Sequence, residues 1–210
     1  MESLVQTITV YAIPVLLAIT LHEAAHGYVA RLFGDDTAYI AGRITLNPLK
    51  HIDPIGTIAV PLVILLVTKG MLFGWAKPVP VSIGRLRRPK QDMVWVAAAG
   101  PGSNLAMAIL WAIFFSAQRS LGLDEQFFQS MALAGIQVNL VLMALNLLPV
   151  PPLDGGRIMV GLLPHRISHQ FARIEPFGFI IVIVLLATGT LGVFLSPFLQ
   201  LGRVIVGAFI

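Results

Sequence analysis

The amino-acid sequence predicts an all-α polytopic membrane protein, a helical bundle of about four to six membrane segments with one short β-element. Of its 210 residues, 57% are hydrophobic and only 11% are charged, whereas charged residues make up ~25% of ordinary soluble domains. Several apolar stretches approach the ~20 residues that a helix needs to cross a bilayer. The basic residues cluster between these stretches, so the net charge of +4 indicates membrane topology and does not point to nucleic acid.

The first membrane segment is predicted at residues 4–32, and it ends at Arg31 and the break Gly34-Asp35-Asp36. Its apolar start at 4–21 is not interpreted as a signal peptide, because no basic residue precedes it and it runs on without a break. Residues 37–53 alternate polar and apolar side chains before Asn47-Pro48. This alternation predicts an extended, β-like segment.

The next stretch, residues 55–68, is apolar but short for a membrane span, and Pro61 lies in its middle. Residues 71–91 form a basic loop, in which Pro78 and Pro80 flank a possible strand. Further spans are predicted at 92–117 and 127–148. The segment 154–175 is polar and basic.

The apolar tail, residues 176–210, could form one span plus an interfacial helix, or a tight hairpin. The sequence contains no internal repeat, no low-complexity tract and no linker long enough to separate two domains. Residues 1–210 are therefore expected to form a single integral-membrane domain with its core at 4–160.

Loop charge predicts a topology in the cell membrane. The basic clusters at 71–91 and 154–175 are expected in the cytoplasm, and the N-terminus outside, because no basic residue precedes Arg31. A complete crossing by 55–68 would place the first cluster outside. We therefore expect 55–68 to be re-entrant or shallow, and the chemically interesting regions to lie near the cytoplasmic side.

The strongest functional signal is the sequence His22-Glu23-Ala24-Ala25-His26 inside the first apolar segment. On a helix, two histidines four residues apart share one face and can reach a single zinc ion. Glu23 is adjacent and could act as the general base of a hydrolysis. Ionisable side chains at the centre of a membrane helix cost ~2.5–3.5 kcal/mol each on insertion scales, so a metal would compensate for them. The sequence has no cysteine, which excludes thiolate ligands and disulfides.

A catalytic zinc site commonly has three protein ligands and one open position. Asp154 is the best candidate for the third ligand, because it follows the 127–148 span directly within Leu153-Asp154-Gly155-Gly156-Arg157. The prolines before it expose the backbone, and the two glycines allow a tight turn that could direct the carboxylate back to the bundle. An ordinary Asp-Gly turn at the membrane edge is the alternative.

Two other polar pairs are weaker candidates. His165 and His169 are also four residues apart, but they lie among arginines in a polar segment, so we expect them to face solvent or lipid headgroups. His51 and Asp53 flank a predicted turn at Asp53-Pro54, where the aspartate would cap the turn. A position of His51 in the lining of the site stays open.

Three stretches, in this order and on membrane segments, resemble the site-2 proteases, a family of intramembrane zinc metalloproteases. They are His22–His26, Ala99–Asn104, and Asn146–Arg157 around Leu153-Asp154-Gly155. The similarity covers roughly residues 4–160, whereas the tail is only compatible in character. The chain departs from the family pattern by inserting the apolar 55–68 segment, and no part of it resembles a PDZ or CBS domain.

The resemblance implies that His22, His26 and Asp154 ligate one zinc ion per chain and that Glu23 is the catalytic acid and base. It implies that Asn146 binds the substrate backbone or the developing oxyanion. Residues 37–53 are similar in position to the membrane-associated β-element that pairs with substrate in this family. The resemblance also implies a structural role, close to the site, for the family's Gly-Pro-x-x-Asn motif, which here consists of Gly100, Pro101 and Asn104.

The implied function is zinc-dependent hydrolysis of peptide bonds in transmembrane helices, that is, regulated intramembrane proteolysis. The implied partners are transmembrane protein or peptide substrates and the lipid bilayer. A zinc-dependent membrane transporter or channel is the alternative from another class, although transport gains nothing from a base beside the first histidine. An inactive homologue that only binds membrane partners is a third hypothesis, against which the intact motifs argue. The oligomeric state and the physiological substrate cannot be derived from the sequence.

Overall fold

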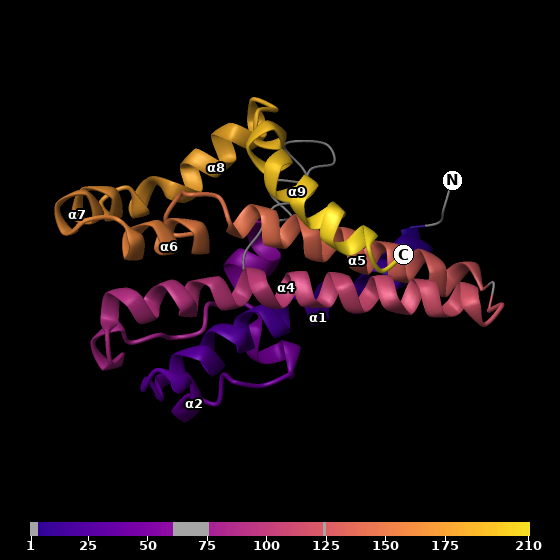
Figure 1. The fold of residues 1–210 in the computed structure, drawn as a ribbon, viewed down its shortest axis with the longest axis horizontal. Helices are drawn as coiled ribbons and strands as arrows, with labels where there is room; N and C mark the ends of the chain where they lie inside the picture. The colour runs from indigo at the N-terminus through magenta and orange to yellow at the C-terminus, as the bar shows by residue number, and fades with distance from the viewer. Residues whose placement is uncertain (1–3, 61–75, 124) are drawn as a thin grey trace.

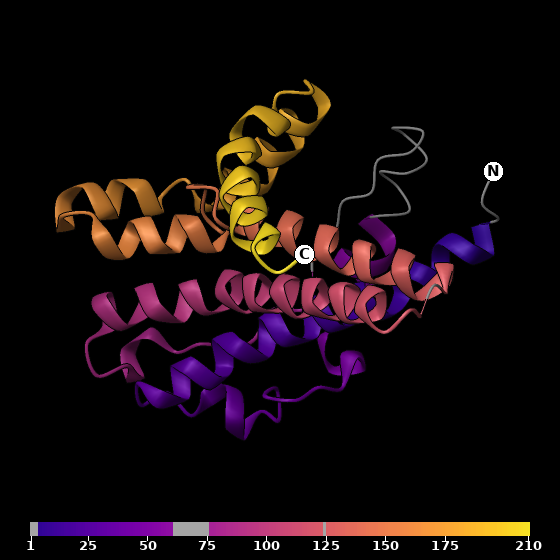
Figure 2. The same cartoon turned by 45° about the vertical axis from the view of Figure 1, so that its right-hand side comes forward.

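The structure is a computed structural model that describes residues 4–60, 76–123 and 125–210. In these three ranges every regular element is helical, and no strand occurs. The centre of the molecule is formed by three long helices that run side by side, α1 (Leu4–Leu32), α4 (Pro89–Ser120) and α5 (Gln126–Asn146) (Figures 1 and 2). The predicted all-α bundle is thus confirmed.

The helices have the length and composition of membrane spans. The predicted spans at 4–32, 92–117 and 127–148 coincide with α1, α4 and α5. Within the described residues, four stretches are long and apolar enough to cross a bilayer, which indicates a multi-pass membrane protein. They are Gln6–Leu32, Pro89–Ser120, Gln126–Asn146 and His165–Ala187.

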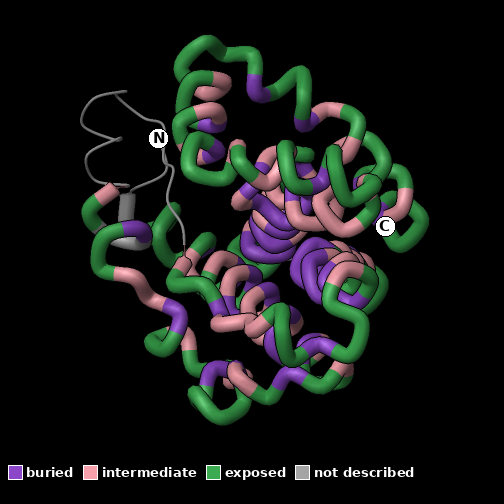
Figure 3. Tube along the Cα trace, turned by 90° about the vertical axis from the view of Figure 1, so that its left-hand side faces the viewer, coloured by how far each residue is buried: buried purple, intermediate pink, exposed green. Residues whose placement is uncertain are grey.

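Small side chains line the contacts between the long helices. Ala18 of α1, Ala108 and Ala112 of α4, and Ala132 and Ala144 of α5 are all fully buried. Small residues let helix backbones approach closely, which is how helices associate in membranes, where lipid offers no hydrophobic driving force between them. Buried residues accordingly gather where the helices face one another (Figure 3).

The outward surface of the same helices is rich in large apolar side chains. Ile13 of α1, Leu110 and Phe114 of α4, and Leu133 of α5 are exposed, with between 39% and 64% of their surface accessible. A soluble protein rarely exposes so continuous an apolar surface. This distribution is the one expected for helices that face lipid.

The end of α1 and the beginning of α4 lie at the same end of the bundle. The Arg87 amide donates to the Phe33 carbonyl at 3.1 Å, and Ala30 packs with Leu86 and Met93 in one apolar cluster. The connection between α1 and α4 therefore starts and finishes on one side. Most of the stretch 55–68, for which we predicted an incomplete crossing, lies outside the described residues, as does part of the basic loop 71–91.

The prediction that residues 37–53 are extended is wrong, because two parts of this segment form helical turns. Residues Thr37–Ile40 form α2 and Pro48–His51 form the 3-10 helix η1. Local hydrogen bonds explain the difference: Asp35 accepts from the Thr37 amide at 3.0 Å, and Asn47 accepts from the Leu49 amide at 3.0 Å. Side chains of this kind start helical turns and thereby override an alternating pattern. The predicted β-element is absent from the described part of the chain.

After α5, the chain forms a second group of shorter helices that cover one side of the bundle (Figure 1). The predicted polar stretch is helical, and the apolar tail forms two helices joined by a turn at Gly189, whose φ is +72°. The second of them packs along α5, and Leu191 and Leu195 join Ala144 in one apolar cluster. The elements are α6 (Asp154–Leu162), α7 (His165–Ala172), η4 (Glu175–Phe177), α8 (Gly178–Ala187) and α9 (Leu191–Gly207).

Candidate metal centre

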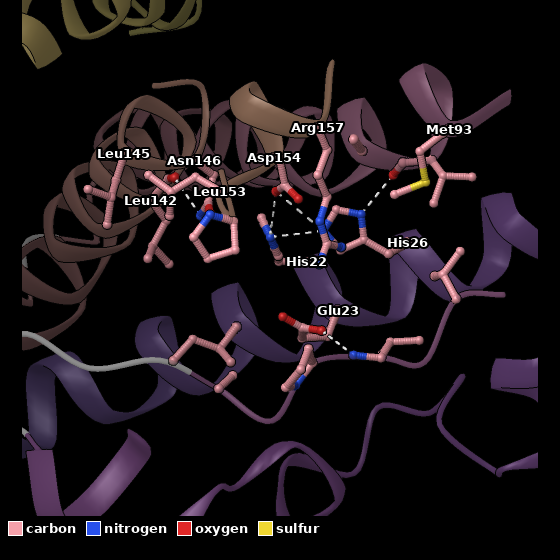
Figure 4. A pocket seen from close by; sticks show the side chains of 18 of the residues that line it. His22, Glu23, His26, Met93, Leu142, Leu145, Asn146, Leu153, Asp154 and Arg157 are labelled. Carbon is pink, nitrogen blue, oxygen red and sulfur yellow. Dashed lines mark hydrogen bonds and ion pairs between the residues drawn. The ribbon is translucent and has the colours of Figure 1, made fainter. Parts of the chain in front are cut away.

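Three side chains from two distant parts of the chain meet inside the bundle. His22 and His26 lie one turn apart on α1, with their Nε2 atoms 3.1 Å from each other. Asp154, the first residue of α6, places Oδ2 at 3.2 Å from Nε2 of His22 and at 3.4 Å from Nε2 of His26 (Figure 4). All three residues are buried. They form a group whose ligand atoms could hold one metal ion.

The far nitrogen of each imidazole has an acceptor of its own. Nδ1 of His22 lies 2.6 Å from Oδ1 of Asn104, and Nδ1 of His26 lies 2.7 Å from the Val96 carbonyl. Because these oxygens only accept hydrogen bonds, each Nδ1 carries the proton and each Nε2 keeps its lone pair. Partners of this type are typical of metal-binding histidines.

The donor set fits a zinc ion. Two Nε2 lone pairs and a carboxylate oxygen face one another in a buried space, and Oδ2 of Asp154 has no hydrogen-bond donor there. Electron-rich atoms this close together require a cation. Two imidazoles and one carboxylate match catalytic zinc sites.

The glycines around Asp154 allow a close approach of backbones, which differs from the role predicted for them. A Cβ on Gly155 would lie 2.3 Å from the Leu147 carbonyl oxygen, and one on Gly156 would lie 2.2 Å from the Pro151 nitrogen. Both glycines are in the first turn of α6, and neither has a positive φ. They therefore let α6 begin directly against the end of α5, and this contact places the carboxylate.

The predicted Gly-Pro-x-x-Asn motif lies on α4 opposite the histidines. Asn104 contacts His22 directly, and Gly100 faces both imidazoles. Pro101 is buried within the helix. Asn104 and Gly100 thus lie against the two histidines, whereas Pro101 is buried in the same helix.

Glu23 belongs to the same pocket, a cavity of about 500 Å³ with a mainly apolar lining. Its Oε2 accepts a hydrogen bond of 2.8 Å from the Val79 amide, as Figure 4 shows. Val79 belongs to the non-helical segment 76–82, which lines the pocket through Ala76, Pro78, Val79 and Val81. No local pattern in the sequence indicates that this segment reaches the site, since its position depends on tertiary structure.

Two further polar residues line the cavity. Asn146, at the end of α5, is half-buried, and its Nδ2 donates to the Leu142 carbonyl one turn earlier at 3.0 Å. Arg157 extends from α6 toward the histidines (Figure 4). From the sequence, Arg157 was expected only as part of the basic segment 154–175 and as the end of the third family stretch, with no role at the site. Its place three residues after Asp154, on the same side of a helix, was the available signal.

The weaker candidates lie elsewhere. His165 and His169 are exposed on α7, which agrees with the prediction that they face solvent or headgroups. Asp53 accepts from the amides of Ile55 and Gly56 and so caps the π-helical turn η2 (Pro54–Ala59), as predicted. His51 is buried near the Thr45 carbonyl and does not belong to the lining of the pocket.

Comparison with known proteins agrees with this geometry. The model of "Peptidase family M50" matches residues 118–188. The "Putative zinc metalloprotease YwhC" of Bacillus subtilis (strain 168) is 41% identical over 200 residues, which cover 91% of this chain and 86% of that protein.

More distant relatives carry a related name. The "Putative zinc metalloprotease Rip2" of Mycolicibacterium smegmatis is 32% identical over 188 residues, and that of Mycobacterium tuberculosis H37Rv is 29% identical over 180 residues. Each of these two alignments covers 84% of this chain and 66% of the relative. No solved structure matches the chain.

Proposed function

This chain belongs to peptidase family M50, the site-2 proteases, and we propose that it is an intramembrane zinc metalloprotease that cleaves transmembrane helices. The observation that carries the proposal is the convergence of His22, His26 and Asp154 within hydrogen-bonding distance of one another inside a bundle of apolar helices. Glu23 in the same cavity turns a metal site into a candidate hydrolytic site.

We assign His22 Nε2, His26 Nε2 and Asp154 Oδ2 as the ligands of one zinc ion. Zinc held there would polarise the scissile carbonyl and lower the pKa of water toward ~7. The three side chains approach from α1 and α6, and the cavity leaves room for water and substrate. Their burial keeps the surroundings apolar, which strengthens every electrostatic interaction within.

Glu23 is assigned the proton transfers. The Val79 amide donates to Oε2, so Oε1 is the oxygen that accepts the proton of the attacking water. The same carboxyl group then delivers the proton to the leaving amine. The hydrogen bond to Val79 keeps the carboxylate in one orientation at the wall of the pocket.

Asn146 is assigned the stabilisation of the oxyanion. A side-chain amide has two N–H donors. One donates to the Leu142 carbonyl, which fixes the amide plane, and the other is available to the substrate. A well-placed donor of this kind contributes ~3 kcal/mol to the transition state.

The substrate must present an extended backbone to this site, because a transmembrane helix satisfies its own amides. Local unwinding is easier where the substrate helix contains glycine or proline. Apolar residues of the pocket, among them Val15, Ile19 and Leu145, would accommodate the apolar side chains of such a segment. The non-helical segment 76–82 is the described part of the chain best placed to lie along it.

The charge distribution supports a location of the site toward the cytoplasm. His22 lies ten residues before the end of α1, which is about 15 Å along a helix. The segments 77–90 and 154–175, which are rich in basic residues, lie at that end of the bundle (Figure 1), where Lys90 donates to the Leu163 carbonyl. By the positive-inside rule, this end faces the cytoplasm and the N-terminus lies outside.

The test is cleavage of a panel of single-span peptides by the purified protein in detergent. Glu23→Gln removes the base and leaves the ligands, so zinc stays at about one per chain while cleavage falls by at least ~100-fold. Glu125→Gln, an exposed residue beside the start of α5, is the matched control and should cleave normally. The double variant His22→Ala, His26→Ala should contain no zinc.

The outcomes separate the hypotheses. Full cleavage by Glu23→Gln would contradict the mechanism, and undiminished zinc in the double variant would contradict the ligand assignment. Zinc flux across vesicles without any cleavage would identify a transporter. Bound zinc with neither flux nor cleavage would identify an inactive homologue.

A further inference from the structure

A pair of buried amides connects the candidate metal centre to α5. Asn104 of α4 and Asn139 of α5 have no accessible surface. Nδ2 of Asn104 donates to Oδ1 of Asn139 at 3.0 Å. Unpaired polar groups inside a membrane bundle cost several kcal/mol, so two such side chains in contact constrain one another strongly. Asn139 lies outside all three family motifs.

A backbone carbonyl fixes the direction of the Asn139 amide, and Asn139 in turn orients Asn104. Nδ2 of Asn139 donates to the Gly135 carbonyl at 2.8 Å, and a carbonyl can only accept. Oδ1 of Asn139 must therefore face Asn104. Nδ2 of Asn104 in turn faces both this oxygen and the Ala18 carbonyl, which lies 3.3 Å away. Oδ1 of Asn104 is left to face Nδ1 of His22, at 2.6 Å.

We propose that Asn139 is a positioning residue that acts through Asn104 to hold His22 with its proton on Nδ1. This inference rests on the proposed zinc site. Its consequence is that Nε2 of His22 presents its lone pair to the metal. Asn139 itself does not touch the ligand cluster. Without the Asn139 oxygen, only the more distant Ala18 carbonyl, at 3.3 Å, opposes a rotation of the Asn104 amide by 180°. A rotated amide directs its amino group at His22, which favours a proton on Nε2 and blocks ligation.

His26 provides an internal comparison. Its Nδ1 faces the Val96 carbonyl, a backbone group that cannot rotate. The two ligands therefore differ: the tautomer of His26 is set by the backbone of α4, whereas that of His22 depends on two side chains. A change at Asn139 should affect His22 alone.

The test compares two variants of almost the same shape. In a helix, the threonine hydroxyl of Asn139→Thr can donate to the carbonyl four residues back, which here is Gly135, and can accept from Asn104. Asn139→Val fills the same space without a hydroxyl. Gln118→Leu is the control for the loss of a buried amide, because Gln118 is buried in α4 with no hydrogen-bond partner for its amide in the described structure.

Two quantities are measured on the full-length chain in micelles. Competition with a chromogenic chelator gives zinc affinity, and 15N correlation spectra of histidine-labelled, metal-free protein report which ring nitrogen of each histidine is protonated. We expect Asn139→Val to weaken zinc binding by about 10–100-fold and to give mixed tautomers at His22 only. Asn139→Thr and Gln118→Leu should stay within about threefold of the wild type.

The tautomer measurement needs neither zinc nor substrate, so it tests this inference even if the proposed protease function fails. An unchanged His22 tautomer in Asn139→Val would overturn the inference. So would equal zinc affinities of the Thr and Val variants. Equal disturbance of His22 and His26 would also overturn it, because Asn139 would then support packing in general.

Discussion

Gly100 of α4 lies so close to His26 that a Cβ at this position would be 2.4 Å from His26 Nε2. The same Cβ would be 2.6 Å from Cε1 of His22, and real Cβ atoms do not make contacts this short. Neither ring can move away without losing its Nδ1 hydrogen bond to Asn104 or Val96. The absence of a side chain at Gly100 is thus a condition for the metal centre to form.

Gly100→Ala should therefore weaken zinc binding by at least ~10-fold, the effect of displacing a ligand from its oriented position, and reduce peptide cleavage in parallel. Gly102→Ala is the matched control on the same helix, because nothing lies within 4 Å of its Cβ. Zinc affinity by chelator competition and helicity by circular dichroism are the measurements. Equal zinc affinities of the two alanine variants would contradict this role of Gly100.

The sequence was sufficient to predict the parts of the protein that depend on local patterns. Helical spacing placed His22 and His26 on one face, and apolar length located the three long helices. The position of Asp154 directly after a span pointed to the third member of the cluster. Each of these features is encoded within about 30 neighbouring residues, where periodicity and helix length are readable.

What the sequence did not reveal depends on contacts between distant segments. The Val79 amide on Glu23 and the Asn104–Asn139 pair join residues 56 and 35 positions apart, and no local pattern marks them. The error at 37–53 had the opposite cause. There, Asp35 and Asn47 start helical turns through hydrogen bonds that an alternating pattern of polarity does not represent.

The hydrogen bond from Val79 to Glu23 predicts a selective effect on catalysis. Val79→Pro removes the amide hydrogen and should lower kcat roughly 10-fold, the value of about 1.5 kcal/mol for a hydrogen bond to a charged group. Zinc content should not change, because the three proposed ligands belong to α1 and α6 and keep their own hydrogen bonds. Val79→Ala retains the amide and is the control. Equal kcat values for the two variants would show that this bond does not orient the base.

Asp35 predicts a pH dependence of stability away from the metal site. The residue is buried after α1, where it accepts from the Thr37 amide and hydroxyl and from the Ser82 amide, the last at 2.6 Å. Burial raises the pKa of Asp35, but the hydrogen bonds from Thr37 and Ser82 lower it more, so the pKa lies below its usual value. The ionised carboxylate thus stabilises the fold above the pKa of an unfolded aspartate, ~3.9. This stabilisation is lost as the pH falls through the folded pKa.

Asp35→Asn should therefore lower the free energy of unfolding by about 1–3 kcal/mol at neutral pH and should weaken its dependence on pH below ~4. Asp36→Asn is the neighbouring control, because Asp36 is exposed and pairs with Arg31 at 3.3 Å on the surface, where such pairs contribute little. Thermal unfolding in detergent across acidic pH measures both. A wild-type pH dependence in Asp35→Asn would contradict the assignment.

Membrane orientation can be tested with single cysteines, because the chain has none of its own. The turn between α4 and α5 lies at the end of the bundle opposite α2 and the beginning of α4 (Figure 1). An exposed residue of this turn is Leu123. At the other end, Ser82 belongs to the basic loop and Gln170 of α7 is exposed. Gln170 is a better labelling position on α7 than the nearby Ser168, which is buried and donates to the Val160 carbonyl at 2.7 Å.

In intact cells, Leu123→Cys should react with an impermeant thiol reagent, and Ser82→Cys and Gln170→Cys should react only after permeabilisation. The reason is that basic segments stay in the cytoplasm, and the bond between Arg87 and Phe33 keeps the loop around Ser82 at the end of α1 that we propose to face the cytoplasm. The fraction of each variant that is labelled before and after permeabilisation is the measurement. The reverse pattern would show that the protein has the opposite orientation in the membrane, with the metal centre toward the outside. Different sides for Ser82 and Gln170 would contradict the arrangement of the bundle itself, because both lie at the end where α1 finishes and α4 begins.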